Sequence, residues 1–524
     1  MSERISVLTE LIGGDVDQLR STAQSVLSQS HSNWQWKLVT TEPLGVSPAD
    51  PISRLAQSDD RIQIINCGTH ADPQAAFNAA LADVDGEFII RLGLGDLLAR
   101  RALKSVAALG QRRPDVELIY ADEVIEDHAG NELRRENKPT WSPERLLGQD
   151  YLTGLVAIRR SVLDRVGGLR LGFGRASHYD FMLRLGEAAQ AVSSIPEVLY
   201  RSRVRAGTGE DVVDEPGYRR AVESALQRRG LMGEVVEVGS GLRRVHRAAS
   251  WTPSVSVIIP TAAKRASIWG FDMAMVVNLL HSIVSVSTYR DVELIVVADD
   301  PLCDAVSSQI SAVAPQVKII GYDKEFNFSE KCNLGAAQSR GEVLVFLNDD
   351  MEVISADWIE TLVGFLQEPD VGAVGPLLLD DQRRVQSAGH TVGPRLFGRG
   401  AARSCVDLGA DLMLTREVCG ITGAAIAMRA AVFEEVGGFA HELPRSFNDV
   451  DLCYRLLASG KRVLWTPNAE LFHFESKTRD STAHADELAE IDRRWAEELR
   501  YDPYLRMDLT EFDRRSAIWL HGAH

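Results

Sequence analysis

Three short polar segments in the second half of the chain carry residue types that could do chemistry. The first is Asn348-Asp349-Asp350, which directly follows the apolar run 342–347. Carboxylate oxygens suit Mg²⁺ and Mn²⁺, and a cation held in this way can bridge to a diphosphate. Asn-Asp clusters also form turns and caps. Taken alone, the segment leaves a divalent-metal ligand and a structural turn both open.

The second segment, residues 446–455, places Asn448 and Asp449 at the start of an amphipathic helix. In a structural role Asn448 would cap this helix, and the negative charge of Asp449 would interact favourably with the positive end of the helix dipole. Asp451 would pair with Arg455 four residues later. In a chemical role, a carboxylate held at the helix start beside a metal-bound diphosphate could act as a general base.

The third candidate is His473, which lies between two phenylalanines after an expected strand over 462–465. A lone histidine flanked by aromatic residues is most often a partly buried side chain. It can also be the third ligand of a metal ion.

The elements that must position these residues occur twice along the chain. Three paired stretches keep the same internal spacing in both copies: 78–87 with 333–342, 166–169 with 436–439, and 180–184 with 451–455. This self-similarity indicates two copies of one domain in tandem, each of roughly 200 residues.

Within each copy, short β-branched runs alternate with segments of helical period, which is typical of a mostly parallel sheet covered on both faces. Ligands of such sheets bind beyond the carboxyl ends of the strands. In the second copy the expected strands are 255–259, 293–297, 317–320 and 342–347. Between the copies we expect a helix over 215–230 and a connector over 240–253, and near the end a charged helix over 485–500.

Composition narrows the class of protein. The 524 residues include 57 Lys and Arg against 74 Asp and Glu, a net charge of -17, which argues against nucleic-acid binding. The six cysteines form no CxxC pair, so we expect reduced thiols and no zinc site. We find neither a secretory signal pattern nor an apolar run of ~18 residues, and we expect a cytoplasmic protein. Peripheral contact with the inner face of the plasma membrane and homo-oligomer formation are left open.

Together these segments resemble the family 2 inverting glycosyltransferases, which have the GT-A fold. The resemblance covers nearly all of residues 254–480. The segments that carry it are 255–261, 326–336, 340–350, 371–376, 436–439, 447–452 and 465–473. It extends to the first copy, so the layout is similar to that of two-domain enzymes of O-antigen or capsule synthesis, rhamnosyltransferases among them.

The resemblance implies roles for individual residues. Asp350 and His473 would hold Mg²⁺ or Mn²⁺, and Asp449 would be the catalytic base. The residues implied in binding the nucleotide-sugar are Pro260, Thr261, Asp299, Lys331, Asn333, Asn348 and Asp349. The sequence departs from the family at Ala298-Asp299, where the base-binding carboxylate is shifted or replaced, and at an insertion over 263–272, which we expect to reshape the nucleotide pocket.

The first copy keeps the scaffold residues but lacks the charged ones. Its counterpart of the metal-binding segment is Gly93-Leu94-Gly95, with Asp96 one residue beyond, and the base position is His178. The metal-histidine position falls on residues 201–202, and the nucleotide-binding strand ends without aspartate at 39–42. This pattern predicts a non-catalytic domain that docks the second copy, binds the acceptor glycan or forms an oligomer contact. A metal-independent transferase with His178 as base is the alternative.

The implied fold is α/β, with two tandem GT-A (Rossmann-like, nucleotide-diphospho-sugar transferase) domains and a C-terminal helical tail. The expected segments are a degenerate domain 1–214, a helix and linker 215–253, a catalytic domain 254–480 and a helical extension 481–524. The implied activity is inverting, metal-dependent sugar transfer from a nucleoside-diphosphate donor to a glycan or lipid-linked glycan in cell-surface polysaccharide synthesis. The alternative is a glycan-binding scaffold in which both copies have decayed. A sugar nucleotidyltransferase is disfavoured because 260–264 does not resemble its Gly-rich phosphate loop.

Overall fold

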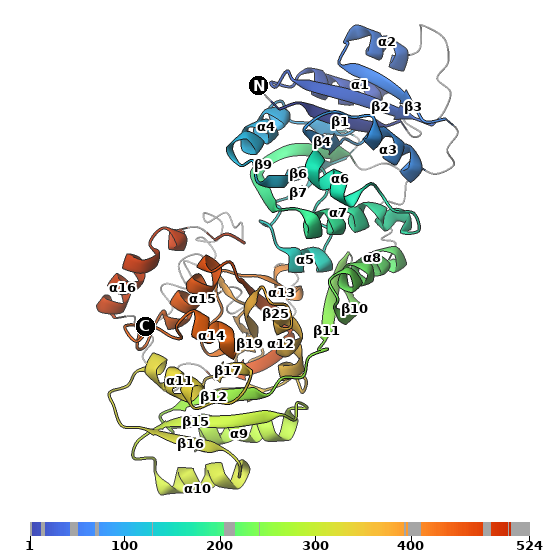
Figure 1. Ribbon diagram of the computed structural model, residues 1–524. Helices are drawn as coiled ribbons and strands as arrows, with labels where there is room; N and C mark the ends of the chain where they lie inside the picture. The colour runs from blue at the N-terminus through green and yellow to red at the C-terminus, as the bar shows by residue number, and fades with distance from the viewer. Residues whose placement is uncertain are drawn as a thin grey trace. The chain divides into compact units, whose positions relative to one another are not determined.

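The computed structural model describes residues 3–11, 16–41, 51–68, 73–127, 129–203, 215–239, 241–391, 395–396, 410–474, 484–500 and 502–504. The chain divides into two compact units, Met1–Arg229 and Gly230–His524. Each unit is built around one large mixed sheet (Figure 1). Among the described residues, no helix is both long enough and apolar enough to span a bilayer.

The elements of the first unit are β1 (Ile5–Glu10), α1 (Val16–Leu27), β2 (Trp34–Thr40), α2 (Pro51–Ser58), β3 (Ile62–Asn66), α3 (Pro73–Ala82), β4 (Phe88–Arg91), β5 (Leu97–Leu98), α4 (Ala102–Arg112), β6 (Val116–Glu126), β7 (Glu132–Glu136), α5 (Pro143–Gly148), β8 (Val156–Arg159), α6 (Arg160–Val166), η1 (Gly174–Ala176), α7 (Ser177–Ala188), β9 (Ala191–Arg203) and α8 (Glu215–Arg228).

The elements of the second unit are β10 (Met232–Gly239), β11 (Leu242–Ala248), β12 (Val255–Thr261), β13 (Arg265–Ile268), β14 (Phe271–Ala274), α9 (Met275–Val286), β15 (Val292–Asp299), α10 (Asp304–Val313), β16 (Lys318–Tyr322), α11 (Phe328–Ala337), β17 (Val343–Leu347), β18 (Met351–Val353), α12 (Trp358–Leu366), β19 (Val371–Leu379), β20 (Val385–Ser387), β21 (His390–Thr391), β22 (Arg395–Leu396), α13 (Ala410–Met413), β23 (Arg416–Glu417), β24 (Ala425–Arg429), α14 (Ala430–Glu435), α15 (Asn448–Ala458), β25 (Arg462–His473), α16 (Ala485–Trp495) and η3 (Glu498–Arg500).

The two sheets have the same topology. The strand order is β3-β2-β1-β4-β8-β6-β9-β5 in the first unit and β16-β15-β12-β17-β24-β19-β25-β18 in the second. The pairings also agree in direction: the first four strands of each order are mutually parallel, and β8 and β24 run antiparallel to both neighbours. The α/β fold and the tandem repeat that the sequence indicates are therefore confirmed.

Two apolar cores hold the second unit together, one on each face of its sheet. Side chains of α9, α10 and α12 fill the first core, and those of α11, α14 and α15 fill the second. The strands are buried on both faces, as the continuous burial of β12 and β17 shows. Helices on both faces leave the strand ends as the place where polar side chains can reach solvent.

All four strands expected in the second copy are present, as β12, β15, β16 and β17. The boundary between the copies differs from our expectation. The helix α8 belongs to the first unit, where Tyr218 stacks on Tyr179 at 5.1 Å. The stretch 240–253, expected to be a connector, contains β11, which forms a hairpin with β10 in the second unit. The charged helix near the end is α16. Residues 481–483 and 505–524 of the expected extension lie outside the described residues.

Candidate active site

The parallel strands of the second unit bring most of the candidate residues to one sheet edge. Strand β12 pairs with β15 up to Thr261↔Ala298, and with β17 up to Ile258↔Phe346. Pro260 and Thr261 close β12, Asp299 closes β15, and Asn348 directly follows β17. This convergence follows from the register, because adjacent parallel strands that start level also end level.

Lys331 ties these strand ends together from α11. Its ammonium group donates to the carbonyl of Thr261 at 3.0 Å and forms an ion pair with Asp299. The rings of Tyr322 and Phe326 lie 5.4 and 5.5 Å from Nζ. The Lys331 side chain is fully buried, whereas that of Asp299 is 44% exposed. Lys331 therefore holds the edge in shape, and Asp299 presents its carboxylate to solvent.

Asp349 is fixed against the end of β12. The hydroxyl of Thr261 donates to Oδ2 of Asp349 at 2.5 Å and accepts the backbone N–H of Ala263 at 2.8 Å. Burial, together with the neighbouring charge of Asp350, raises the pKa of Asp349 to about 7. The edge therefore crowds two carboxylates into a space with little water.

Asp350 and His473 meet across a strand pair. Strand β18 pairs with the end of β25 so that Met351 lies opposite His473, and the N–H of Phe474 donates to the carbonyl of Asp350 at 2.9 Å. The Nε2 atom of His473 lies 3.3 Å from Oδ1 of Asp350, and both side chains are nearly buried. A carboxylate oxygen and an imidazole nitrogen this close are arranged as two neighbouring ligands of one cation. In the described part of the chain, no set of three or more His, Cys, Asp and Glu side chains is grouped as a metal cluster, so this pair would supply only two ligands.

Asp449 lies in the first turn of α15. Its Oδ2 accepts the N–H of Gly423 at 2.7 Å, and its Oδ1 accepts the N–H of Val450 at 2.8 Å. The carbonyl of Ala424, the residue after Gly423, accepts a hydrogen bond from the backbone N–H of Asn348 at 2.9 Å. Consecutive residues ahead of β24 thus hold Asp449 and the Asn348–Asp350 turn beside each other, with the Asp449 carboxylate oriented by two backbone donors.

Asn333 has a structural role in place of the implied ligand contact. Its carboxamide donates to the carbonyl of Phe439 and accepts the N–H of the same residue, at 2.8 and 2.9 Å. Asn78 in the first unit makes the same two bonds to Leu169. Since the unit that lacks the charged site residues keeps this pairing, we assign Asn333 to holding the Gly-Gly turn and leave it out of the site.

Asp451 is also structural. Its carboxylate is fully buried and accepts hydrogen bonds from Arg455 at 2.9 Å, Arg494 at 3.1 Å and the indole N–H of Trp495 at 2.9 Å. It therefore joins α15 to α16. In the first unit, Asp180 pairs in the same way with Arg184, at 2.9 Å.

The corresponding edge of the first unit is closed by its own side chains. The hydroxyl of Tyr200 donates to Asp96 at 2.7 Å and accepts the N–H of Gly93 at 3.1 Å, and Asp96 also accepts the N–H of Arg203. A Cβ atom at Gly93 would lie 2.2 Å from Oδ2 of Asp96, so a side chain there would displace the Asp96 carboxylate from its partners. Burial, with the charges of Arg91 and Lys138, lowers the pKa of His178 to about 3. A histidine this weakly basic is a poor general base at neutral pH.

Sequence reasoning missed Gly423 and the hairpin β13–β14. A glycine that supplies a backbone donor leaves no side-chain signal, and only its place ahead of a buried strand points to a close backbone approach. The hairpin corresponds to the insertion over 263–272. It contacts Glu352 and Phe474, on and beside strands β18 and β25.

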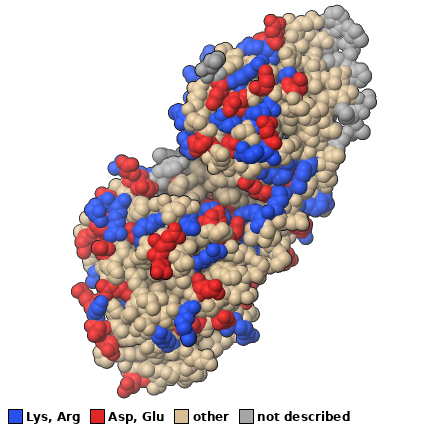
Figure 2. Space-filling model, viewed as in Figure 1, with Lys and Arg blue, Asp and Glu red and all other residues tan. Residues whose placement is uncertain are grey.

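Acidic and basic side chains are interspersed over both units on the face shown in Figure 2. This mixture agrees with the net charge of -17 and provides no continuous basic track on that face.

Residues 256–437 match the family model described as glycosyl transferase family 2. That range contains the strand ends and Asp350, whereas Asp449 and His473 follow it. The chain is 32% identical to the O-antigen biosynthesis protein RfbC of Myxococcus xanthus, over 96% of this chain and 39% of that protein. It is 30% identical to the uncharacterized protein y4gI of Sinorhizobium fredii, over 98% of this chain and 59% of that protein. The chain thus spans about two fifths to three fifths of the length of these relatives.

A solved structure that resembles part of the chain is the mannosyltransferase PcManGT of Pyrobaculum calidifontis, described as a complex with GDP-Man and Mn²⁺. The likeness has a TM-score of 0.32 and 17% identity, and it covers 48% of this chain and 64% of that one.

Proposed function

We propose that the second unit of this chain, whose residues 256–437 match the glycosyl transferase family 2 model, transfers a sugar from a nucleoside-diphosphate donor to a glycan or lipid-linked glycan. The similarity to an O-antigen biosynthesis protein along nearly the whole chain supports cell-surface polysaccharide synthesis as the setting. The observation that carries the proposal is the arrangement of one acidic edge, where Asp350 and His473 lie 3.3 Å apart and Asp449 is oriented by Gly423.

The donor would bind across the ends of β12 and β15. Asp299, held by Lys331 and half exposed, would accept hydrogen bonds from the nucleotide base, and Thr261 with Pro260 would form the wall beside it. Asp349 and Asn348 would face the ribose and the sugar. A rigid edge favours this use, because groups already in place lose little freedom when the donor binds.

Asp350 and His473 would hold Mg²⁺ or Mn²⁺. Their atoms suit such an ion, and the crowding of Asp349 and Asp350 at one edge favours a positive charge between protein and donor. When bound, the cation supplies Lewis acidity that stabilises the negative charge developing on the leaving diphosphate. The protein's own part is to orient the two ligands through the pairing of β18 with β25.

Asp449 would take the proton from the acceptor hydroxyl as that oxygen attacks the anomeric carbon from the side opposite the diphosphate. This attack inverts the configuration at the anomeric carbon. The two backbone N–H groups on the carboxylate hold it in one orientation, so that it needs no reorientation during the reaction.

The first unit would have no transferase activity of its own. Its edge is filled by the bonds among Asp96, Tyr200 and Gly93, and its histidine at the base position is neutral and weakly basic. We propose that it supports the second unit, by docking it or by binding part of the acceptor glycan.

A release assay tests the proposal. The chain is incubated with UDP-, GDP-, dTDP- and CDP-linked sugars and Mn²⁺ or Mg²⁺, with water as the acceptor of the sugar, and the free nucleoside diphosphate is measured. We expect one nucleotide class to be consumed by the wild type, by Asp96→Asn as matched control in the first unit, and not by Asp449→Asn. Consumption that persists in Asp449→Asn but disappears in Asp96→Asn would place the reaction in the first unit and refute the proposal.

A further inference from the structure

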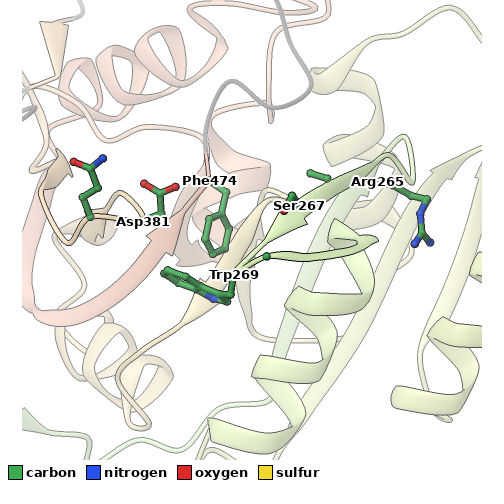
Figure 3. A pocket seen from close by; sticks show the side chains of 8 residues that line it. Arg265, Ser267, Trp269, Asp381 and Phe474 are labelled. Atoms are coloured by element: carbon green, nitrogen blue, oxygen red, sulfur yellow. The ribbon is translucent and has the colours of Figure 1, made fainter.

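A pocket of about 720 Å³ lies beside the end of β25 in the second unit. Its lining includes the side chains of Arg265, Ser267, Trp269, Asp381, Gln382 and Phe474. Figure 3 shows the rings of Trp269 and Phe474 close to each other, the Asp381 carboxylate near them and the Arg265 side chain directed away. The pocket thus combines an aromatic surface with hydrogen-bonding groups.

Trp269 has an unusual backbone for a bulky residue. It and Gly270 form the two-residue turn of the β13–β14 hairpin, where Ile268 pairs with Phe271, and their φ angles are 51° and 86°. Such turns favour Asn, Asp or Gly at the first position, and a bulky side chain at positive φ is strained. Strain of this kind is concentrated at binding and catalytic sites.

The indole is nevertheless fixed in place and open to solvent. Its N–H donates to Glu352 at 2.9 Å, and its ring meets the edges of Phe472 and Phe474 at 5.1 and 5.4 Å. About half of the side chain, 49%, remains exposed. A rigid, exposed aromatic face is a ready binding surface, because little side-chain freedom is lost when a ligand covers it.

The pocket adjoins the proposed reaction centre through the backbone. Glu352, which holds Trp269, is on β18 two residues after Asp350, and Phe474 directly follows His473. The N–H of Phe474 bonds to the carbonyl of Asp350 at 2.9 Å. A ligand in the pocket would therefore lie beside the end of the strand that carries His473.

The chemistry of the lining selects the class of ligand. The carboxylate of Asp381 disfavours a phosphate or a nucleotide in the pocket, and the Arg265 guanidinium is already paired with Asp272 at 2.8 Å. A sugar ring presents an apolar C–H face that fits an indole and hydroxyl groups that bond to Asp381 and Gln382. Resting on the function proposed above, we propose that this pocket is a subsite for a neutral sugar residue of the acceptor glycan, with Trp269 as its stacking platform.

A printed array of bacterial O-antigen and capsular oligosaccharides tests the subsite with the labelled full chain. We expect the wild type to bind at least one neutral glycan, and Trp269→Ala to bind it at least about tenfold more weakly. Phe271→Ala is the matched control, because Phe271 is on the same hairpin, is 69% exposed and does not line the pocket. It should bind within about twofold of the wild type.

Two further measurements keep the result interpretable. Trp269→Asn places a residue suited to positive φ in the turn, so a folded Trp269→Asn chain that has lost glycan binding assigns the loss to the indole rather than to the hairpin. Calorimetry of UDP, GDP, dTDP and CDP with Mn²⁺ on the wild type tests the proposed function separately. If the wild type binds a nucleotide but no neutral glycan, only the subsite is overturned. The same follows if Trp269→Ala binds the glycan as tightly as the wild type does. If the wild type binds no nucleotide, the proposed function is overturned whatever the array shows.

Discussion

The ring nitrogen Nε2 of His473 lies 3.3 Å from Oδ1 of Asp350, although the two residues belong to different parts of the second unit. The antiparallel pairing of β18 with β25 brings the two residues together, because it sets Met351 opposite His473 and Asp350 directly precedes Met351. The N–H of Phe474 donates to the carbonyl of Asp350 and extends this pairing by one residue. The contact therefore depends on the fold of the edge as a whole.

Asp449→Asn should separate chemistry from binding. The asparagine keeps an oxygen that can accept the N–H of Gly423 but cannot take a proton from the acceptor. We expect kcat to fall by about 10²–10⁴-fold while the donor dissociation constant stays close to that of the wild type. Steady-state kinetics and calorimetry on the same preparation measure both quantities. An unchanged kcat would show that another group is the base.

Asp451→Ala should act on stability instead. Removing this carboxylate leaves Arg455, Arg494 and the indole N–H of Trp495 without their shared acceptor. We expect the free energy of unfolding of the second unit to fall by about 3–5 kcal/mol, the cost of leaving one side of a buried ion pair alone. Urea unfolding followed by circular dichroism measures the change, and a loss under about 1 kcal/mol would show that the α15–α16 contact is not structural.

Glu117 should make the first unit sensitive to acid. Hydrogen bonds from Arg165, assisted by Ser161 and the backbone N–H of Gln190, lower the pKa of this nearly buried carboxyl to about 2. Its stabilising contribution is complete above the unfolded pKa, near 4.5, and is lost as the pH falls toward 2.

The variant Glu117→Gln measures that contribution. Because Arg165 is partly exposed, we expect the variant to be less stable than the wild type by only about 1–2 kcal/mol at pH 7. The difference should shrink as the pH is lowered from about 5 to about 2. A difference that stays constant over this range would contradict the assignment.

Gly93→Ala should destabilise the first unit. The added Cβ would lie 2.2 Å from Oδ2 of Asp96, which is held by Tyr200 and the N–H of Arg203. We expect a loss of about 1–3 kcal/mol in thermal or urea unfolding, as for other overpacked sites. An unchanged free energy of unfolding in Gly93→Ala would refute the view that this edge is closed.

The sequence was sufficient for the parts of the fold that repeat. Strand periodicity and the spacing from Asn333 to Glu342 predicted β12, β15, β16 and β17 and their shared edge, because register in a parallel sheet follows from regular apolar runs. The same spacing could not reveal what Asn333 does. A carboxamide on a helix such as α11 has the same sequence signature whether it meets a ligand or, as here, the backbone of Phe439.

Other features depend on contacts between distant residues and left no local signal. The segment 240–253 has the sequence pattern of a connector, because charged residues occupy both the inward and the outward positions of β11 and hide its strand alternation. In the sequence the hairpin of Trp269 is recognisable only as an insertion over 263–272. In the structure, contacts of Trp269 with Glu352, Phe472 and Phe474 set its direction. Local pattern alone could not predict which strand it would contact.

The most direct test of the central claim is calorimetric titration of UDP, GDP, dTDP and CDP into the wild type and Asp350→Ala, each with and without Mn²⁺. The account predicts binding of one nucleotide that requires Mn²⁺ and is lost in Asp350→Ala, while Asp96→Asn binds as the wild type does. Metal-dependent binding that survives in Asp350→Ala, or the absence of nucleotide binding at millimolar concentration, would contradict a transferase site at this edge.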